Sequence, residues 1–231
     1  MEMGYRKMND NITMPTLEKM SDFFESRLEG YDEHMLNNID SAREFYQYTA
    51  ELLPFDDGCH ILDLGCGTGL ELEFYYKLNP SAVVTGIDLS SAMLEAMKAK
   101  FVDKKLNLIQ GSYFDVPFGD DTYDGAVSVE SLHHFTKAEK IPLYAKVCNA
   151  LKDGSSFVLT DYFSLTDEEE YMHRRNLEML KSEQEIDDDE FYHYDTPLTV
   201  AHETEALYEA GFSVVEVVKS WGATFTVKAT K

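Results

Sequence analysis

The chain has 231 residues and a formal net charge of −23, because 43 acidic side chains outnumber 20 basic ones. A field of this sign repels polyanions, so neither nucleic acid nor an anionic membrane surface is expected as a partner. Hydrophobic residues make up 44% of the chain, which is enough to bury the core of one folded domain and excludes wholesale disorder.

No apolar run approaches the roughly 18 residues that a bilayer span requires, and the first residues lack the apolar core of a secretory signal. The three cysteines form no CxxC pair, and an odd number cannot close a disulfide framework. We therefore expect reduced thiols in a cytoplasmic protein.

Helical patterns open the sequence, and an alternation of strands and helices follows. Apolar residues recur at helical spacing from Leu17 to Leu28, and a second helical stretch runs from Ile39 to Leu53. Strands are predicted at 60–64, 82–87, 106–109, 125–129 and 155–160, and helices at 70–78, 91–101 and 137–151. This alternation predicts a mainly parallel sheet with helices on both faces.

The alternation stops after Tyr162. A charged helix from Thr166 to about Glu185, an acidic run at 187–190 and an aromatic cluster at 191–194 predict an insertion over one end of the sheet. A helix at 200–210 and strands at 214–218 and 224–229 then predict a closing antiparallel hairpin. The predicted organisation is a single domain of residues 1–231, with N-terminal helices at 15–53, a core at 59–162 and 199–231, and a cap insertion at 163–198.

The most informative motif is the glycine-rich segment 63–69, which follows a predicted strand and opens a predicted helix. Its glycines permit positive φ and let a nucleotide-like ligand approach the backbone at the carboxyl ends of the strands. The spacing is GxGxG, with Leu70 at the last glycine of the dinucleotide pattern, and no Lys-Ser/Thr follows as in a P-loop. Asp88 follows the second strand, where a carboxylate accepts ribose hydroxyl protons in either NAD or an adenosyl ligand.

Four segments carry a family resemblance: ILDLGCGTG, TGIDLSSAML, GSYFDVPF and YDGAVSVESLHHF. Their order and intervals resemble class I S-adenosylmethionine-dependent methyltransferases, in particular those that act on small molecules such as quinones, over roughly Tyr31 to Thr160. The resemblance implies a three-layer Rossmann-like α/β fold. Its seven strands would have the order 3-2-1-4-5-7-6, with strand 7 antiparallel and a helical cap. It also implies methyl transfer from S-adenosyl-L-methionine to a small-molecule acceptor.

The resemblance also implies which residues hold the cofactor. The methionine part would be wrapped by Gly65, Cys66 and Gly67, with Asp63 near its amino group and Val129 at its end. The ribose would be bound by Asp88. The adenine would be enclosed by Leu89 and Met93, with Ser112 and Tyr113 at its edge. The family often has Asp in place of Ser112, and a hydroxyl accepts the adenine amino proton less strongly.

Two N-terminal residues are further candidates for the cofactor site. Arg27 would pair with the cofactor's carboxylate, because a guanidinium fork suits a carboxylate and no arginine occurs in residues 44–173. A solvated helix charge is its alternative role. Tyr31 would cover the cofactor as a lid, with core packing as the alternative.

His133 and His134 follow the fourth strand and are the candidate catalytic residues, because an imidazole can take a proton from an acceptor that must lose one. Packing against the sheet is the alternative role. His193 either lines the acceptor pocket or anchors the cap. No metal site is expected, since the acidic run 187–190 is typical of a solvated face and residues 202–205 do not form HExxH.

Two other functions remain compatible with these residues. One is an enzyme that uses the cofactor for a reaction other than methylation, such as forming a carboxylated derivative. The other is a non-catalytic, cofactor-binding regulatory protein whose acidic cap docks a basic partner. A nicotinamide dehydrogenase is disfavoured by the glycine spacing. The acceptor itself is chosen by cap and loop residues that vary within one fold.

Overall fold

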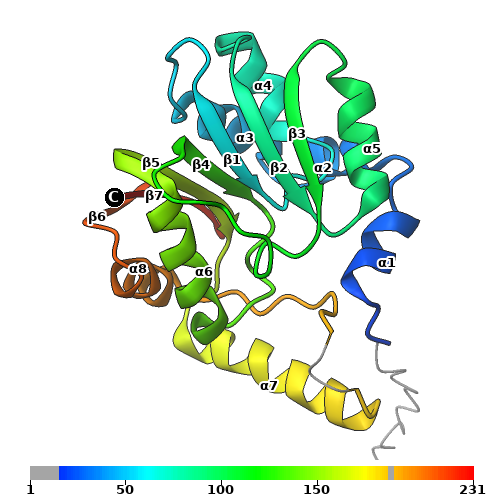
Figure 1. The fold of residues 1–231 in the computed structure, drawn as a ribbon. Helices are drawn as coiled ribbons and strands as arrows, with labels where there is room; N and C mark the ends of the chain where they lie inside the picture. The colour runs from blue at the N-terminus through cyan, green and yellow to red at the C-terminus, as the bar shows by residue number, and fades with distance from the viewer. Residues whose placement is uncertain (1–15, 187–189) are drawn as a thin grey trace, which may run out of the picture.

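The computed structural model describes residues 16–186 and 190–231 of the chain. Within these ranges seven strands form one sheet with helices on both faces (Figure 1). The strands are β1 (His60–Leu64), β2 (Val83–Asp88), β3 (Lys105–Gln110), β4 (Tyr123–Val129), β5 (Leu151–Tyr162), β6 (Val214–Trp221) and β7 (Thr224–Thr230). They lie in the order β3-β2-β1-β4-β5-β7-β6, which confirms the predicted order.

Strand direction also agrees with the prediction. Strands β3, β2, β1, β4 and β5 run parallel, and β7 runs antiparallel to both β5 and β6. The closing antiparallel hairpin is therefore confirmed.

The helices cover both faces of the sheet. They are α1 (Met20–Ser26), α2 (Tyr31–Asn38), α3 (Ala42–Glu51), α4 (Leu70–Leu78), α5 (Ser91–Lys100), α6 (Lys137–Ala150), α7 (Asp167–Glu183) and α8 (Val200–Glu209). Phe45 of α3 shares a hydrophobic cluster with Ile61 of β1, whereas Tyr144 of α6 shares the other cluster with Leu62. Because neighbouring strand residues point to opposite faces, both faces are buried, which explains the continuous apolar strands of the sequence.

The two largest differences from the sequence prediction concern α2 and β5. Helix α2 was not predicted, and it contains no fully buried residue, so its sequence lacks the apolar stripe that marks a packed helix. Strand β5 begins at Leu151, four residues earlier than expected. Its residues 152–154 are exposed, so no apolar run marks this part of the strand.

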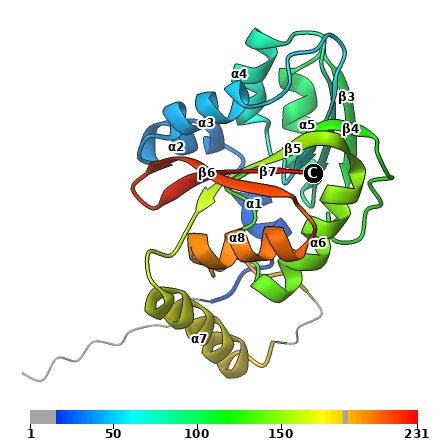
Figure 2. The same cartoon turned by 90° about the vertical axis from the view of Figure 1, so that its left-hand side faces the viewer.

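The chain between β5 and α8 contains α7 and a return segment, residues 190–199. Figures 1 and 2 both show α7 away from the sheet, beyond α8. The return segment connects α1 to the loop after β4. Met20 N donates to the Phe191 carbonyl at 2.9 Å, and Thr196 N donates to the His133 carbonyl at 2.9 Å. None of the helices in the described ranges combines the length and apolar character needed to cross a membrane.

Candidate functional site

The glycine loop after β1 has a backbone shape that only glycine adopts without strain. Gly65 has φ +69° and Gly67 has φ +50°. A Cβ atom on Gly65 would lie 1.9 Å from Ser131 Oγ, so the loop after β4 packs directly against this glycine.

Asp88, at the end of β2, fixes the glycine loop. Gly67 N donates to Asp88 Oδ2 at 2.9 Å, and Ser90 N donates to Asp88 Oδ1 at 2.8 Å. Burial raises the pKa of Asp88, and these backbone donors oppose the rise. Each carboxylate oxygen has two acceptor sites, so both can still accept a further proton donor.

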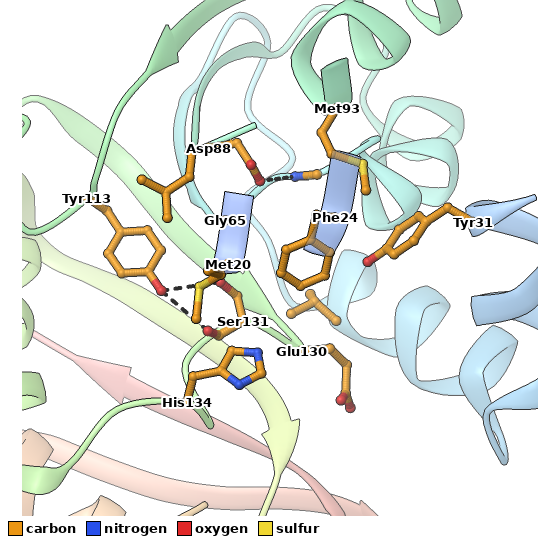
Figure 3. Close-up of a pocket in the computed structure, with 13 residues that line it drawn as sticks. Met20, Phe24, Tyr31, Gly65, Asp88, Met93, Tyr113, Glu130, Ser131 and His134 are labelled. Atoms are coloured by element: carbon orange, nitrogen blue, oxygen red, sulfur yellow. Dashed lines mark hydrogen bonds between the residues drawn. The ribbon is translucent and has the colours of Figure 1, made fainter. Parts of the chain in front are cut away.

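A cavity of about 60 Å³ lies between this loop, α1 and the loop after β4 (Figure 3). It brings together the predicted residues Tyr31, Gly65, Gly67, Asp88, Leu89, Met93, Tyr113, Val129 and His134. Met20, Phe24, Glu130 and Ser131 also line it and were not predicted. Figure 3 shows Met20 and Phe24 pointing into the space between Asp88 and His134.

Four predicted cofactor residues lie outside this cavity lining, and three of them, Asp63, Cys66 and Ser112, lie in or near the loops around it. Asp63 is 1% exposed, and burial together with the nearby Glu71 carboxylate raises the pKa of Asp63. Cys66 is buried against β2, where a Cβ on Gly86 would lie 2.8 Å from its Sγ, and burial raises the pKa of this thiol. Ser112 Oγ accepts a hydrogen bond from Phe114 N at 3.2 Å.

Arg27 also lies outside the glycine-loop cavity. Its guanidinium donates to Glu18 at 2.9 Å and lies 3.7 Å from the centre of the Phe23 ring. The side chain is 44% exposed, and it lines a second, larger cavity instead.

The second cavity has a volume of about 690 Å³ and adjoins the first. Phe24, Tyr31, Glu130 and His134 line both cavities, so these four residues mark the boundary between them. The rest of its wall comes from α1, α2, His133 and the return segment through His193 and Asp195. His193 also stacks on Phe23 with ring centres 3.4 Å apart.

His133 lies in this wall between two carboxylates. Its Nδ1 donates to Asp161 Oδ1 at 2.5 Å, and its Nε2 lies 3.4 Å from Asp195 Oδ1. Burial opposes protonation of His133, but the two carboxylates outweigh burial and hold its pKa well above the usual value. Burial alone would raise the pKa of Asp195, yet His133 and His134 lower it.

The pKa values of the other ionisable groups in this wall are shifted in different directions. His134 Nδ1 lies 3.2 Å from the Tyr194 carbonyl and 3.3 Å from Asp195 Oδ1. Burial and the neighbouring His133 lower the pKa of His134, and burial lowers that of His193 to about 4. Burial and Asp161 raise the pKa of Glu130 to about 8.

Among the residues that sequence reasoning missed, Glu130 and Ser131 differ from Asp195 in whether the sequence carries a signal for them. Glu130 and Ser131 directly follow β4, so the rule that selected Asp88 at the end of β2 would also have selected them. Asp195 has no such signal, because it reaches His133 only through the return segment. Of the acidic run 187–190, residues 187–189 lie outside the described residues, and Glu190 pairs with Lys19 at 2.5 Å.

Comparisons with known proteins agree with this geometry. Residues 61–154 match the family described as a methyltransferase domain. Three curated relatives are similar over part of their length. The 24-methylenesterol C-methyltransferase 3 of Arabidopsis thaliana is 31% identical over 125 residues, 52% of this chain and 33% of that protein. The O-methyltransferase cnsE of Penicillium expansum is 35% identical over 46% of this chain and 39% of that protein. The demethylmenaquinone methyltransferase of Symbiobacterium thermophilum is 30% identical over 59% of this chain and 56% of that protein.

Solved structures show the same fold. A putative O-methyltransferase from Nostoc punctiforme superposes with a TM-score of 0.68 at 23% identity, over 94% of this chain and 62% of that one. Human N-acetylserotonin methyltransferase in complex with SAM superposes with a TM-score of 0.57 at 17% identity, over 90% of this chain and 55% of that one.

The strand order β3-β2-β1-β4-β5-β7-β6 is that of the class I methyltransferase fold. Residues 61–154 match a methyltransferase-domain family, and the fold of the described residues is the one seen in solved methyltransferase structures. The chain spans from about a third to somewhat over half the length of the curated relatives named above.

Proposed function

We propose that the protein transfers a methyl group from S-adenosylmethionine to a small-molecule acceptor that binds in the larger cavity. The observation that carries this proposal is the wall shared by the two cavities. Phe24, Tyr31, Glu130 and His134 face both the glycine-loop cavity and the larger cavity. A ligand in one cavity would therefore meet a ligand in the other at this boundary.

The residues present fit the cofactor. Gly65 and Gly67 leave the backbone open to its methionine part, and Asp88 has free acceptor sites for the two ribose hydroxyls. Leu89 and Met93 provide apolar surface for the adenine. We place Asp63, Cys66 and Ser112 as support behind or beside the loop, in keeping with the burial of Asp63 and Cys66 and with the hydrogen bond that Ser112 accepts.

Cofactor binding requires a movement of α1 in this proposal. Small-molecule pockets usually measure about 300–1,000 Å³, whereas the glycine-loop cavity measures about 60 Å³. Met20 and Phe24 of α1 occupy the space in front of Asp88 (Figure 3). Displacing these two side chains is the direct way to enlarge the cavity.

The chemistry divides between the cofactor and the chain. The cofactor supplies an activated methyl group on a sulfonium, and the protein supplies alignment and exclusion of water. Apolar side chains such as Met35 and Ile39 line the larger cavity and would hold the body of the acceptor. We place its reacting group against His133 and His134, the candidate catalytic residues, because His134 lies at the cavity boundary and His133 is its neighbour.

Calorimetry with S-adenosylmethionine and S-adenosylhomocysteine tests the proposal. Asp88→Ala is expected to weaken binding by about 1–3 kcal/mol, the scale of a hydrogen bond to a charged group, or roughly 5- to 150-fold in Kd. Asp103→Ala, an exposed carboxylate, serves as the matched control. The proposal is wrong if the wild type binds neither compound at millimolar concentration.

A label-transfer assay tests the reaction itself. The protein is incubated with cofactor labelled in the methyl group and with a panel of phenols, alcohols, thiols and amines. Transfer of label to one class supports the enzyme. Cofactor binding without transfer to any class supports the non-catalytic, regulatory function instead.

A further inference from the structure

We propose that His133, His134 and Asp195 form an open site for a divalent metal ion of zinc-like chemistry in the wall of the larger cavity. The donor atoms are His133 Nε2, His134 Nδ1 and Asp195 Oδ1. A set of one such atom from each residue lies within 4.8 Å of one another. Imidazole nitrogen and carboxylate oxygen are both common zinc ligands. No sequence motif predicts this site, since 60 residues separate the histidines from Asp195.

The distances between these donor atoms match an ion between them better than direct hydrogen bonds. Asp195 Oδ1 lies 3.4 Å from His133 Nε2 and 3.3 Å from His134 Nδ1. Charge-assisted hydrogen bonds usually measure about 2.7–2.9 Å. Two ligands that are each about 2.0–2.1 Å from a tetrahedral zinc ion lie about 3.3–3.4 Å apart. The same bond length in octahedral geometry puts neighbouring ligands about 2.8–3.0 Å apart, so four-coordination fits better.

Asp195 supplies a second, independent observation. Its Oδ1 atom is buried and makes no hydrogen bond among the described residues, although both imidazoles lie within ion-pair distance of it. A buried acceptor that loses water without gaining a donor is costly. A cation at this position would satisfy that oxygen. Asp161, which lies on the other side of His133, differs because its carboxylate already accepts from His133, from Leu132 N at 2.8 Å and from Tyr162 N at 2.9 Å.

Asp161 also orients His133 as a ligand. The carboxylate is 1% exposed and binds Nδ1 of the imidazole, which directs Nε2 toward Asp195. Metal-binding histidines usually have such an outer carboxylate or carbonyl partner on the second ring nitrogen. His134 Nδ1 has the Tyr194 carbonyl as its other neighbour at 3.2 Å, and metal binding would replace this contact.

The fourth position of the ion would be open. Three protein ligands with one open position are typical of catalytic zinc, and all three residues here line the larger cavity. An acceptor hydroxyl or thiol that coordinates the ion loses its proton to water more readily, because the cation stabilises the anion. The acceptor atom keeps the electron pair and forms the bond to the methyl carbon, and the sulfonium becomes a thioether. This role, which rests on the proposed function, selects alcohols, phenols and thiols with an apolar body as the substrate class.

Metal binding is measured directly on the full chain. The EDTA-treated protein is titrated with Zn²⁺ against a chromophoric chelator, and we expect one ion per chain. Asp195→Asn and His134→Gln should each weaken binding by more than the roughly 10–100-fold that loss of an outer partner costs. His60→Gln, at the exposed start of β1, is the control and should bind like the wild type. Absence of binding in the wild type, or unchanged affinity in both Asp195→Asn and His134→Gln, overturns the site.

Two further measurements separate this site from the proposed function and from misfolding. Cobalt(II) in place of zinc should give the intense visible absorption of a four-coordinate ion, and a weak six-coordinate spectrum would contradict the geometry. Binding of S-adenosylhomocysteine in the presence of EDTA should be the same in the wild type and Asp195→Asn, which shows that the variant folds. Zinc binding without binding of S-adenosylhomocysteine would leave the metal site standing and refute the methyltransferase proposal.

Discussion

Replacing Gly65 with alanine tests the packing of the glycine loop against the loop after β4. The new Cβ would lie 1.9 Å from Ser131 Oγ and 2.6 Å from Ser131 Cβ, and the residue has φ +69°. The left-handed backbone costs alanine about 1–2 kcal/mol, and overpacking adds about 1–3 kcal/mol. We therefore expect Gly65→Ala to lower the free energy of unfolding by about 2–5 kcal/mol.

Gly154→Ala separates the two costs. Gly154 has φ +78°, but a Cβ there would meet nothing within 4 Å, so this variant carries only the backbone cost. Urea unfolding of both variants gives the difference, and the double variant Gly65→Ala/Ser131→Gly should recover the part due to the clash. The reasoning is refuted if Gly65→Ala destabilises the protein no more than Gly154→Ala does.

Three further predictions concern a buried ion pair, a buried pair of carboxyl groups and a side chain in the glycine-loop cavity. Lys140 pairs with Glu203 at 2.6 Å with both side chains buried, so Lys140→Met should cost about 3–5 kcal/mol in urea unfolding by leaving an uncompensated carboxylate. Burial raises the pKa of both Asp63 and Glu71, so the folded state keeps a proton that the unfolded chain loses above about pH 4. The free energy of unfolding should therefore fall as pH rises above that value, and it should fall less steeply in Glu71→Gln. Urea unfolding of both proteins at about pH 5 and about pH 8 measures the two slopes. Met20→Ala should tighten binding of S-adenosylhomocysteine in calorimetry, because Met20 occupies the cavity in front of Asp88.

Each of these predictions has a result that contradicts it. The buried pair is unimportant if Lys140→Met loses under about 1 kcal/mol, and Lys140→Met/Glu203→Leu should regain most of the loss if the pair explains it. Parallel stability profiles for the wild type and Glu71→Gln would show that the Asp63–Glu71 pair does not hold the proton. Weaker or unchanged binding in Met20→Ala would show that Met20 does not block the cofactor.

The sequence predicts the sheet well because local patterns encode it. Buried parallel strands appear as apolar runs, and the glycines of 65–69 need positive φ whatever surrounds them. Helix α2 cannot be predicted in this way, because none of its residues is buried and its sequence therefore carries no apolar stripe.

The candidate site is predicted only in part, because some of its contacts join distant segments. Asp88 follows from its position at the end of a strand. Arg27 was expected at the cofactor, but Glu18, nine residues earlier, takes up its guanidinium. Asp195 reaches the histidines through a main-chain bond from Thr196 to His133, and no periodicity records such a bond.

The return segment connects the helix that covers the glycine-loop cavity to the wall of the larger cavity. At one end its backbone is bonded to Met20, which covers Asp88, and at the other end to His133, beside the larger space. A movement of α1 that admits the cofactor would therefore displace the return segment and, through it, the wall of the larger cavity. By thermodynamic reciprocity the two ligands should then alter each other's affinity by the same factor.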